Sequence, residues 1–418
     1  MSTPRRNTPQ LLRMQLGLLW AAVAILIIAA LVSVYVHRSG MQTVGRNTAP
    51  SIVAAQHIKV ALAGMDAEAA NALLSARGRD DDAMKAYDAY RQEAAGALIG
   101  AAENITYGEA ERGPIRELQL GAGTYEAKIQ RSRDLYERRD PNYIDAYLEA
   151  ARLMDTALLP AADRLDKANL DVLEAEYEKQ GFHSVLTRGI VVVAAIILLF
   201  ALVSVQSFLS NRTNRTLNLP LVVATLIALA WAGWMVATLS EEQRHLKVAR
   251  QDAFVSIHAL WRARSTAYRA NAQQSRFLLD KSGAKAADTL FREEAASIGN
   301  ELAKAANNIT FEGEREAVAK AKSTFSAYRK IDDEVRRLEI AGRHPEAITL
   351  CLGDSNKAFD AFDRALAAPL AINQTAFDRA VVNGFGALQY FELKASLAAV
   401  AIALLVLLGL IQRIAEYR

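Results

Sequence analysis

Cysteine is almost absent from this sequence, since its 418 residues include only Cys351. One cysteine cannot form an intramolecular disulfide framework or a Cys-based metal site, so we interpret Cys351 as a small buried apolar residue. Catalytic motifs are absent as well: there is no glycine-rich phosphate loop, no H-E-x-x-H and no nucleophile elbow. The six histidines are dispersed along the chain. The sequence therefore predicts a protein that is not an enzyme and that uses no metal or cofactor.

A strong charge of either sign is also missing. Lys and Arg number 49 against 46 Asp and Glu, which gives a net charge of +3. This charge is small for the chain length and argues against nucleic acid as a partner. A chain of 418 residues exceeds one compact core, so we expect two domains together with membrane segments.

Four apolar runs contain no charged side chain, and they cover residues 15–36, 190–209, 217–238 and 395–412. Each run is long enough to cross a lipid bilayer as a helix. We expect the first run to be a retained anchor and not a cleaved signal peptide, because its apolar part is long and no clear cleavage site follows. The lack of ionisable groups within the four spans disfavours a transport path.

Basic residues in the short segments predict the orientation. Each of the three short segments carries arginine: Arg5, Arg6 and Arg13 in residues 1–14, Arg212 and Arg215 in residues 210–216, and Arg413 and Arg418 in residues 413–418. Short basic segments stay on the cytoplasmic side. The sequence therefore predicts a multi-pass plasma-membrane protein with both termini cytoplasmic and with residues 37–189 and 239–394 outside.

The chain contains an internal repeat. Ser51-Ile52 recurs as Ser256-Ile257, Asn104-Ile-Thr-Tyr107 recurs as Asn308-Ile-Thr-Phe311, and Pro141 recurs as Pro345. Each copy consists of an apolar span, a long polar segment and a second apolar span, and the copies join at residues 211–216. Repeats of this kind indicate duplication of one structural unit.

Apolar residues recur at helical spacing through both polar segments, and no strand pattern is present. In the first copy a third helix is expected to begin near Pro114, and a fourth to run from Tyr143 into the second span. Four helices with three turns are typical of an up-down-up-down bundle. We therefore predict an all-α integral membrane protein with four transmembrane helices and two tandem extracytoplasmic four-helix bundles.

Candidate functional residues lie at the predicted turns and ends. Contacts to a partner or ligand at the bundle tips are expected from Arg77, Arg79, Asp80, Asn142, Arg343 and His344, although solvated tip charges are an alternative. Arg212 and Arg215 are candidates for a cytoplasmic relay. Pro160 and Pro369 are possible hinges, because proline kinks helices.

The recurring Asn-Ile-Thr turns have two interpretations. Asn104 with Thr106, and Asn308 with Thr310, could accept glycans as sequons. Because the turns recur at one position of the repeat with an aromatic residue following, we favour a role in ending helices and capping turns.

Two membrane helices that enclose an external four-helix bundle resemble the sensor module of bacterial chemoreceptors and histidine kinases. Those receptors continue into a HAMP or signalling domain, whereas here about six residues follow the last span. The tandem arrangement with a basic N-terminus is similar to actinobacterial membrane proteins of the GlnX type. That resemblance implies a periplasmic amino-acid-binding lipoprotein as the sensed partner and a cytosolic serine/threonine kinase as the recipient of the signal.

Three hypotheses follow. The first is a non-enzymatic signal transducer that could form a homo-oligomer. Its external bundles bind a ligand-loaded periplasmic binding protein and relay the signal to a separate cytoplasmic protein. The second is a structural scaffold that holds envelope proteins through the same bundles. The third, a transport accessory subunit, is disfavoured by the uncharged spans.

Overall fold

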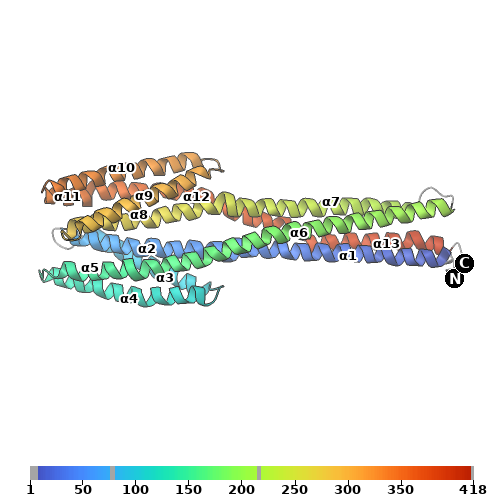
Figure 1. Ribbon diagram of the computed structural model, residues 1–418, viewed down its shortest axis with the longest axis horizontal. Coiled ribbons are helices and arrows are strands. Elements are labelled where there is room, and N and C mark those ends of the chain that lie inside the picture. Colours follow the sequence, from blue (N-terminus) through green and yellow to red (C-terminus); the bar gives the residue numbers. More distant parts are fainter. Residues whose placement is uncertain (1–7, 76–80, 214–217, 416–418) are drawn as a thin grey trace. The chain divides into compact units, whose positions relative to one another are not determined.

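The computed structural model describes residues 8–75, 81–213 and 218–415 (Figure 1). Over these ranges every regular element is a helix, which confirms the all-α prediction. The first half contains α1 (Thr8–Gln42), the π-helical turn η1 (Thr43–Thr48), α2 (Ala49–Leu74), α3 (Asp81–Glu103), α4 (Glu109–Glu137), α5 (Tyr143–Leu153), η2 (Met154–Leu158) and α6 (Leu159–Thr213).

The second half repeats this order. It contains α7 (Leu219–Lys247), η3 (Val248–Phe254), α8 (Val255–Leu279), α9 (Ala284–Asn307), α10 (Glu314–Ile340), α11 (His344–Leu350), η4 (Cys351–Ser355), α12 (Asn356–Ala387) and α13 (Phe391–Ala415). The π-helical turns η1 and η3 fall at equivalent places in the two copies, which supports a gap-free alignment of the first helices.

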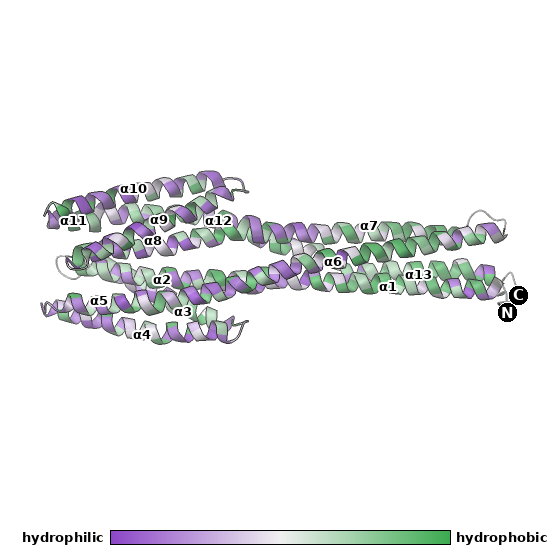
Figure 2. Ribbon diagram, viewed as in Figure 1, coloured by the Kyte–Doolittle hydropathy of each residue, from purple (hydrophilic) through white to green (hydrophobic). Residues whose placement is uncertain are grey.

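The described chain forms two compact units. Unit 1 consists of Met1–Thr43, Ala175–Lys247 and Ala380–Arg418, and unit 2 consists of Val44–Glu174 and Val248–Arg379. Unit 1 holds the apolar runs, and unit 2 holds most of the polar segments, as the hydropathy colours of Figure 2 show.

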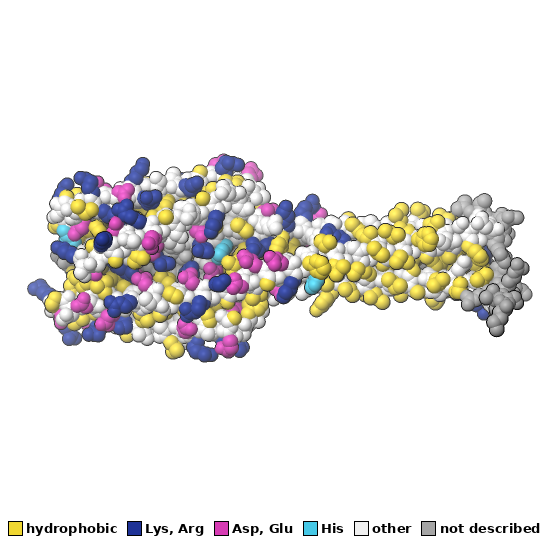
Figure 3. All heavy atoms as spheres, in the orientation of Figure 1, with side chains coloured by type: hydrophobic (Ala, Val, Ile, Leu, Met, Phe, Trp, Pro, Cys, Tyr) yellow, Lys and Arg dark blue, Asp and Glu magenta, His cyan; other side chains and the backbone are white. Residues whose placement is uncertain are grey.

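Unit 1 is built from α1, α7, α13 and the C-terminal part of α6, with a core that includes Leu26, Leu198 and Met235. Its outer surface is also apolar, with large exposed side chains such as Leu18 and Phe200 (Figure 3). An apolar surface of this extent is unfavourable in water. The four helices are long and apolar enough to cross a membrane, which is the property expected of them from the sequence.

One break in unit 1 departs from the repeat. The first copy continues as one helix through α6, whereas in the second copy a turn at 388–390 separates α12 from α13, and Tyr390 has a φ of 58°. The Arg38 side chain lies at this turn, where Nη2 donates to the Leu388 carbonyl at 3.2 Å and Nη1 contacts the Glu392 carboxylate at 2.7 Å. Arg38 thus satisfies a carbonyl near the end of α12.

Unit 2 contains most of both copies of the polar segment, and the copies pack on each other through α2 and α8. Helix α2 also packs on α3, and α8 on α9, so both first helices are surrounded. Alanines such as Ala61, Ala63 and Ala70 let neighbouring helices approach α2 closely. A helix that packs on several sides is buried nearly all round. The two copies therefore share one apolar core and not two separate ones.

The start of α4 differs from the prediction. The helix begins at Glu109, and Pro114 lies inside it. Gly108 precedes the helix with a φ of 66°, a left-handed conformation that glycine adopts readily. The Glu111 carboxylate accepts hydrogen bonds from the backbone amides of Thr106 and Tyr107. Because this carboxylate caps the turn, the helix begins before the proline.

Candidate functional site

The predicted tip residues are described only in part. Arg77, Arg79 and Asp80 lie outside the described residues. Asn142 is exposed before α5, and its backbone amide donates to the Asp140 carboxylate at 3.0 Å.

At the tip of the second copy, Arg343 pairs with Glu346 and His344 pairs with Glu339 at 2.6 Å. These contacts are local along the chain. Arg343 and His344 thus lie at the surface, and both pair with nearby carboxylates.

The predicted relay and hinge residues are dispersed. Arg215 lies outside the described residues, and Arg212 lies in α6, where only the backbone is described. Pro160 follows the π-helical turn η2 in the first turn of α6, and Pro369 lies inside α12. The chain remains helical through both prolines, so a hinge at either position stays a prediction.

The Asn-Ile-Thr turns make equivalent hydrogen bonds in the two copies. Asn104 Nδ2 donates to Ser51 Oγ at 2.8 Å, and Asn308 Nδ2 donates to Ser256 Oγ at 3.0 Å. The Glu314 carboxylate accepts hydrogen bonds from the backbone amides of the second turn, as the Glu111 carboxylate does in the first turn. Each turn is thereby tied to the first helix of its own copy.

A buried polar cluster joins the two copies, and its members are Asp66, Tyr125, Tyr147, Asp155 and Arg276. Arg276 of α8 reaches into the first copy, where its guanidinium pairs with Asp66 and contacts Asp155 at 2.6 Å. Its Nε donates to Tyr147 Oη at 3.1 Å. Tyr125 Oη donates to Asp66 at 3.2 Å. We name this set the inter-repeat cluster.

Sequence reasoning missed this cluster because the partners of Arg276 lie 121 to 210 positions away from it in the chain. Arg276 is only 7% exposed. Burial raises the pKa of Asp66, while the Arg276 guanidinium opposes that shift. Arg276 is one of four arginines in α8, so the sequence alone does not single it out.

Glu294 of α9 lies close to the same charges. Burial raises the pKa of Glu294 to about 7, although Arg269 acts in the opposite direction. The Arg269 guanidinium lies 3.2 Å from the Glu294 carboxylate. A carboxyl group with such a pKa is largely protonated below neutral pH in the folded protein.

We expect the Glu294 carboxyl to make stability fall as pH rises. Between an unfolded pKa near 4.5 and a folded pKa of about 7 the folded state binds more protons, so unfolding becomes easier across this window. The full change is on the order of 3 kcal/mol. Thermal unfolding between pH 5 and pH 8 of the parent and of Glu294→Gln measures it. Equal pH slopes for the two proteins would contradict this assignment.

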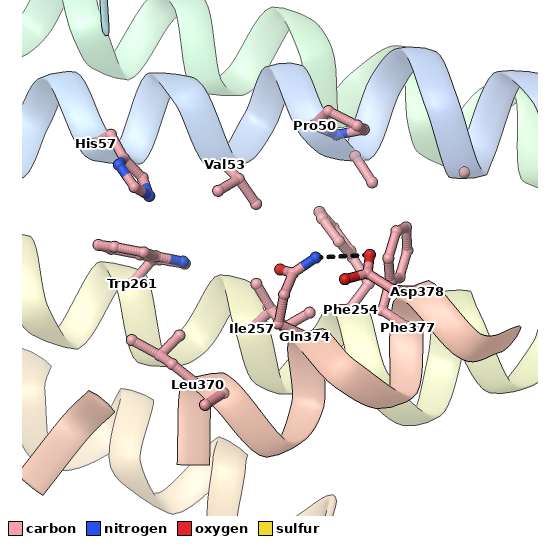
Figure 4. Close-up of a pocket in the computed structure, with 13 residues that line it drawn as sticks. Pro50, Val53, His57, Phe254, Ile257, Trp261, Leu370, Gln374, Phe377 and Asp378 are labelled. Carbon is pink, nitrogen blue, oxygen red and sulfur yellow. Dashed lines mark hydrogen bonds between the residues drawn. The ribbon is translucent and has the colours of Figure 1, made fainter. Parts of the chain in front are cut away.

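An apolar cavity of about 440 Å³ lies between the two copies, lined by α2 and η1 on one side and by η3, α8 and α12 on the other (Figure 4). We name it the inter-repeat pocket. Its lining residues are mostly apolar or aromatic: Gly45, Ala49, Pro50, Val53, His57, Phe254, Ile257, Trp261, Leu370, Ala371, Gln374, Phe377 and Asp378.

The inter-repeat pocket has two unlike ends (Figure 4). At one end His57 and Trp261 lie ring to ring, with centroids 4.2 Å apart. At the other end Asp378 lies beside Phe254 and Phe377, and Gln374 Nε2 donates to the Asp378 carboxylate at 3.0 Å. Burial lowers the pKa of His57, and the nearby Arg264 guanidinium lowers it further. His57 is therefore neutral at pH 7.

A second cavity of about 420 Å³ lies between α3 and α4 of the first copy, lined by Leu98, Ile115 and Ala122 among others. In the second copy Phe325 stands at the position equivalent to Ala122, and it is buried against Phe362. The first copy thus has a cavity at a place where the second copy has the larger side chain of Phe325. Among the described residues no group of three or more His, Cys, Asp or Glu side chains is arranged to hold a metal ion.

Comparison with known families identifies one match. Residues 40–178 match the family model described as an actinobacterial sensor domain. The matched range corresponds closely to the first copy of the polar segment. No match was found among curated proteins or among solved structures. With four apolar helices of membrane-spanning length, the match indicates a membrane protein with a sensing role.

Proposed function

We propose that this protein is a non-enzymatic transmembrane signal transducer. The observation that carries the proposal is the sensor-domain match over residues 40–178, in a chain that also has four membrane-length helices. In this proposal all four helices span the membrane, both termini and the 210–216 linker are cytoplasmic, and each polar segment is an external four-helix bundle.

The input is a ligand-loaded periplasmic binding protein, such as an amino-acid-binding lipoprotein, that docks on the tips of the bundles. The tip residues Asn142, Arg343 and His344 are exposed or partly exposed polar groups suited to such a contact. The output is a separate cytoplasmic protein, such as a serine/threonine kinase, that reads the linker and the termini. A homo-oligomer would provide more than one copy of each surface.

Signal transfer requires two packings with different affinities for the partner. Unit 2 is suited to switch between two packings because its copies share one core and are joined by a buried charged cluster. A displacement of one copy therefore moves the other. Helix α6 is continuous from Leu159 to Thr213 and includes residues of both units. A continuous helix transmits a displacement along its axis with little loss.

Crosslinking and capture from native membranes, with the intact protein as bait and with or without a panel of amino acids, tests this function. We expect ligand-dependent recovery of a periplasmic solute-binding lipoprotein. The double variant Arg343→Glu/His344→Glu should reduce recovery, whereas Lys357→Glu, at an exposed position on α12, should not. Recovery of envelope proteins alone, unchanged by any amino acid, would instead support a scaffold.

A further inference from the structure

The two copies in unit 2 can be compared residue by residue. Equivalent positions are 205 residues apart in the first helix, as with Ser51 and Ser256, and 204 apart in the fourth, as with Asn169 and Asn373. The fully buried Asn169 and Asn373 confirm this register, because each donates to the carbonyl four residues earlier, at 3.0 Å and 2.9 Å. Packing of α2 on α8 therefore creates two equivalent lateral sides.

One lateral side is filled by ion pairs between the copies. His258 of α8 lies 3.2 Å from the Asp166 carboxylate of α6. Arg250 of η3, the turn before α8, lies 3.8 Å from the Glu174 carboxylate of α6. The Arg250 guanidinium also lies over the Phe254 ring, 5.7 Å from its centroid. An arginine of this chain thus lies between a carboxylate and an aromatic face.

The other lateral side has the inter-repeat pocket at the equivalent place. Val53 replaces His258, Leu370 replaces Asp166, Gly45 replaces Arg250 and Asp378 replaces Glu174, and all four residues line the pocket. The carboxylate is kept, while the arginine is replaced by a glycine without a side chain. The space that a cationic side chain would use is therefore part of the cavity.

The chemistry of the lining favours a cation. Asp378 supplies a carboxylate, and Phe254 and Phe377 lie beside it with aromatic rings (Figure 4). Cations are attracted both to carboxylates and to aromatic faces. The described lining residues include no lysine or arginine, and His57 is neutral at pH 7. Apolar and aromatic groups extend from Asp378 to Trp261.

We propose that the inter-repeat pocket binds a small organic monocation, with an ammonium or guanidinium group at Asp378 and Gln374 and an apolar body that extends toward Trp261. The ligand takes the role that Arg250 has on the opposite side. Because both copies line the pocket, an occupied pocket favours one packing of α2 against α8. This site acts on the chain directly and does not depend on a docked binding protein.

Binding by the full-length protein in nanodiscs tests the proposal with three probes of matched shape. Phenethylammonium is the cation, 2-phenylethanol the neutral analogue and 3-phenylpropanoate the anion, and phenethylguanidinium carries a guanidinium in place of the ammonium. We expect a cationic probe to raise the unfolding temperature and to bind at least about tenfold more tightly than the neutral and anionic analogues. Equal binding of the neutral analogue, or no binding of either cation at millimolar concentration, would overturn the proposal.

Variants locate the site. Asp378→Asn should weaken binding of the cation about tenfold or more with little effect on the neutral probe, because it removes the charge and keeps the shape. Gly45→Arg should abolish binding by supplying the arginine of the other copy. The matched control is Glu174→Gln, which removes the equivalent carboxylate on the opposite lateral side, where Arg250 pairs with it. If Gly45→Arg does not fold, Asp378→Asn alone tests the site. Unchanged cation affinity in Asp378→Asn would contradict the assignment.

Discussion

Replacing Arg276 with methionine will destabilise the protein by about 3–5 kcal/mol, because the change leaves Asp66 without its charged partner in the buried inter-repeat cluster. Asp66 is 2% exposed and Arg276 is 7% exposed, so water cannot compensate for the lost contact. The effect is measured by thermal or denaturant unfolding of the full chain in detergent.

Two further variants test whether the loss of stability comes from the buried inter-repeat cluster. Arg337→Met removes an arginine that pairs with Glu334 on the exposed face of α10, and it should cost less than about 1 kcal/mol. Combining Arg276→Met with Asp66→Asn should recover part of the loss, since the second copy already has Asn271 at the position equivalent to Asp66. If Arg276→Met and Arg337→Met cost the same, the cluster does not hold the copies together.

Replacing His37 with leucine will produce a loss of similar size in unit 1. His37 Nδ1 contacts the Glu242 carboxylate, and both side chains are fully buried. The two residues occupy equivalent positions of the repeat, 205 apart, so the pair lies where the two copies meet. Leucine at position 37 leaves a buried carboxylate without a partner, which typically costs about 3–5 kcal/mol.

The double variant His37→Leu/Glu242→Leu should regain most of that loss, because an apolar pair of similar volume needs no partner. Lys179→Leu serves as the control, since Lys179 and Glu176 of unit 1 are 62% and 42% exposed and their ion pair contributes about 1 kcal/mol or less. Unfolding in detergent measures all three proteins. A double variant as unstable as His37→Leu would mean that the pair itself is not the cause.

Much of the architecture was predictable from local patterns in the sequence. Helical periodicity gave the all-α class, and the uncharged apolar runs correspond to the four membrane-length helices. The repeated Asn-Ile-Thr turns mark the ends of α3 and α9, where Asn104 and Asn308 lie. These features depend on residues a few positions apart, so one sequence contains the information that specifies them.

Errors arose where a distant or capping contact outweighed a local preference. Pro114 favours a helix start, yet the Glu111 carboxylate and the left-handed Gly108 place the start of α4 earlier. The tip residue Arg343 pairs with Glu346 at the start of α11, and its role in binding a partner stays a prediction.

The sequence by itself determined the repeat, the helical class and the division into apolar and polar segments, because these follow from composition and periodicity along the chain. Only the tertiary structure decided which faces of α2 and α8 meet. That packing places Arg276 beside Asp66 and leaves an open pocket where Gly45 stands in place of Arg250. In unit 1, the packing of α1 on α7 places His37 beside Glu242. The physical reason is that burial and pairing of charges depend on neighbours hundreds of residues away, which no local pattern records.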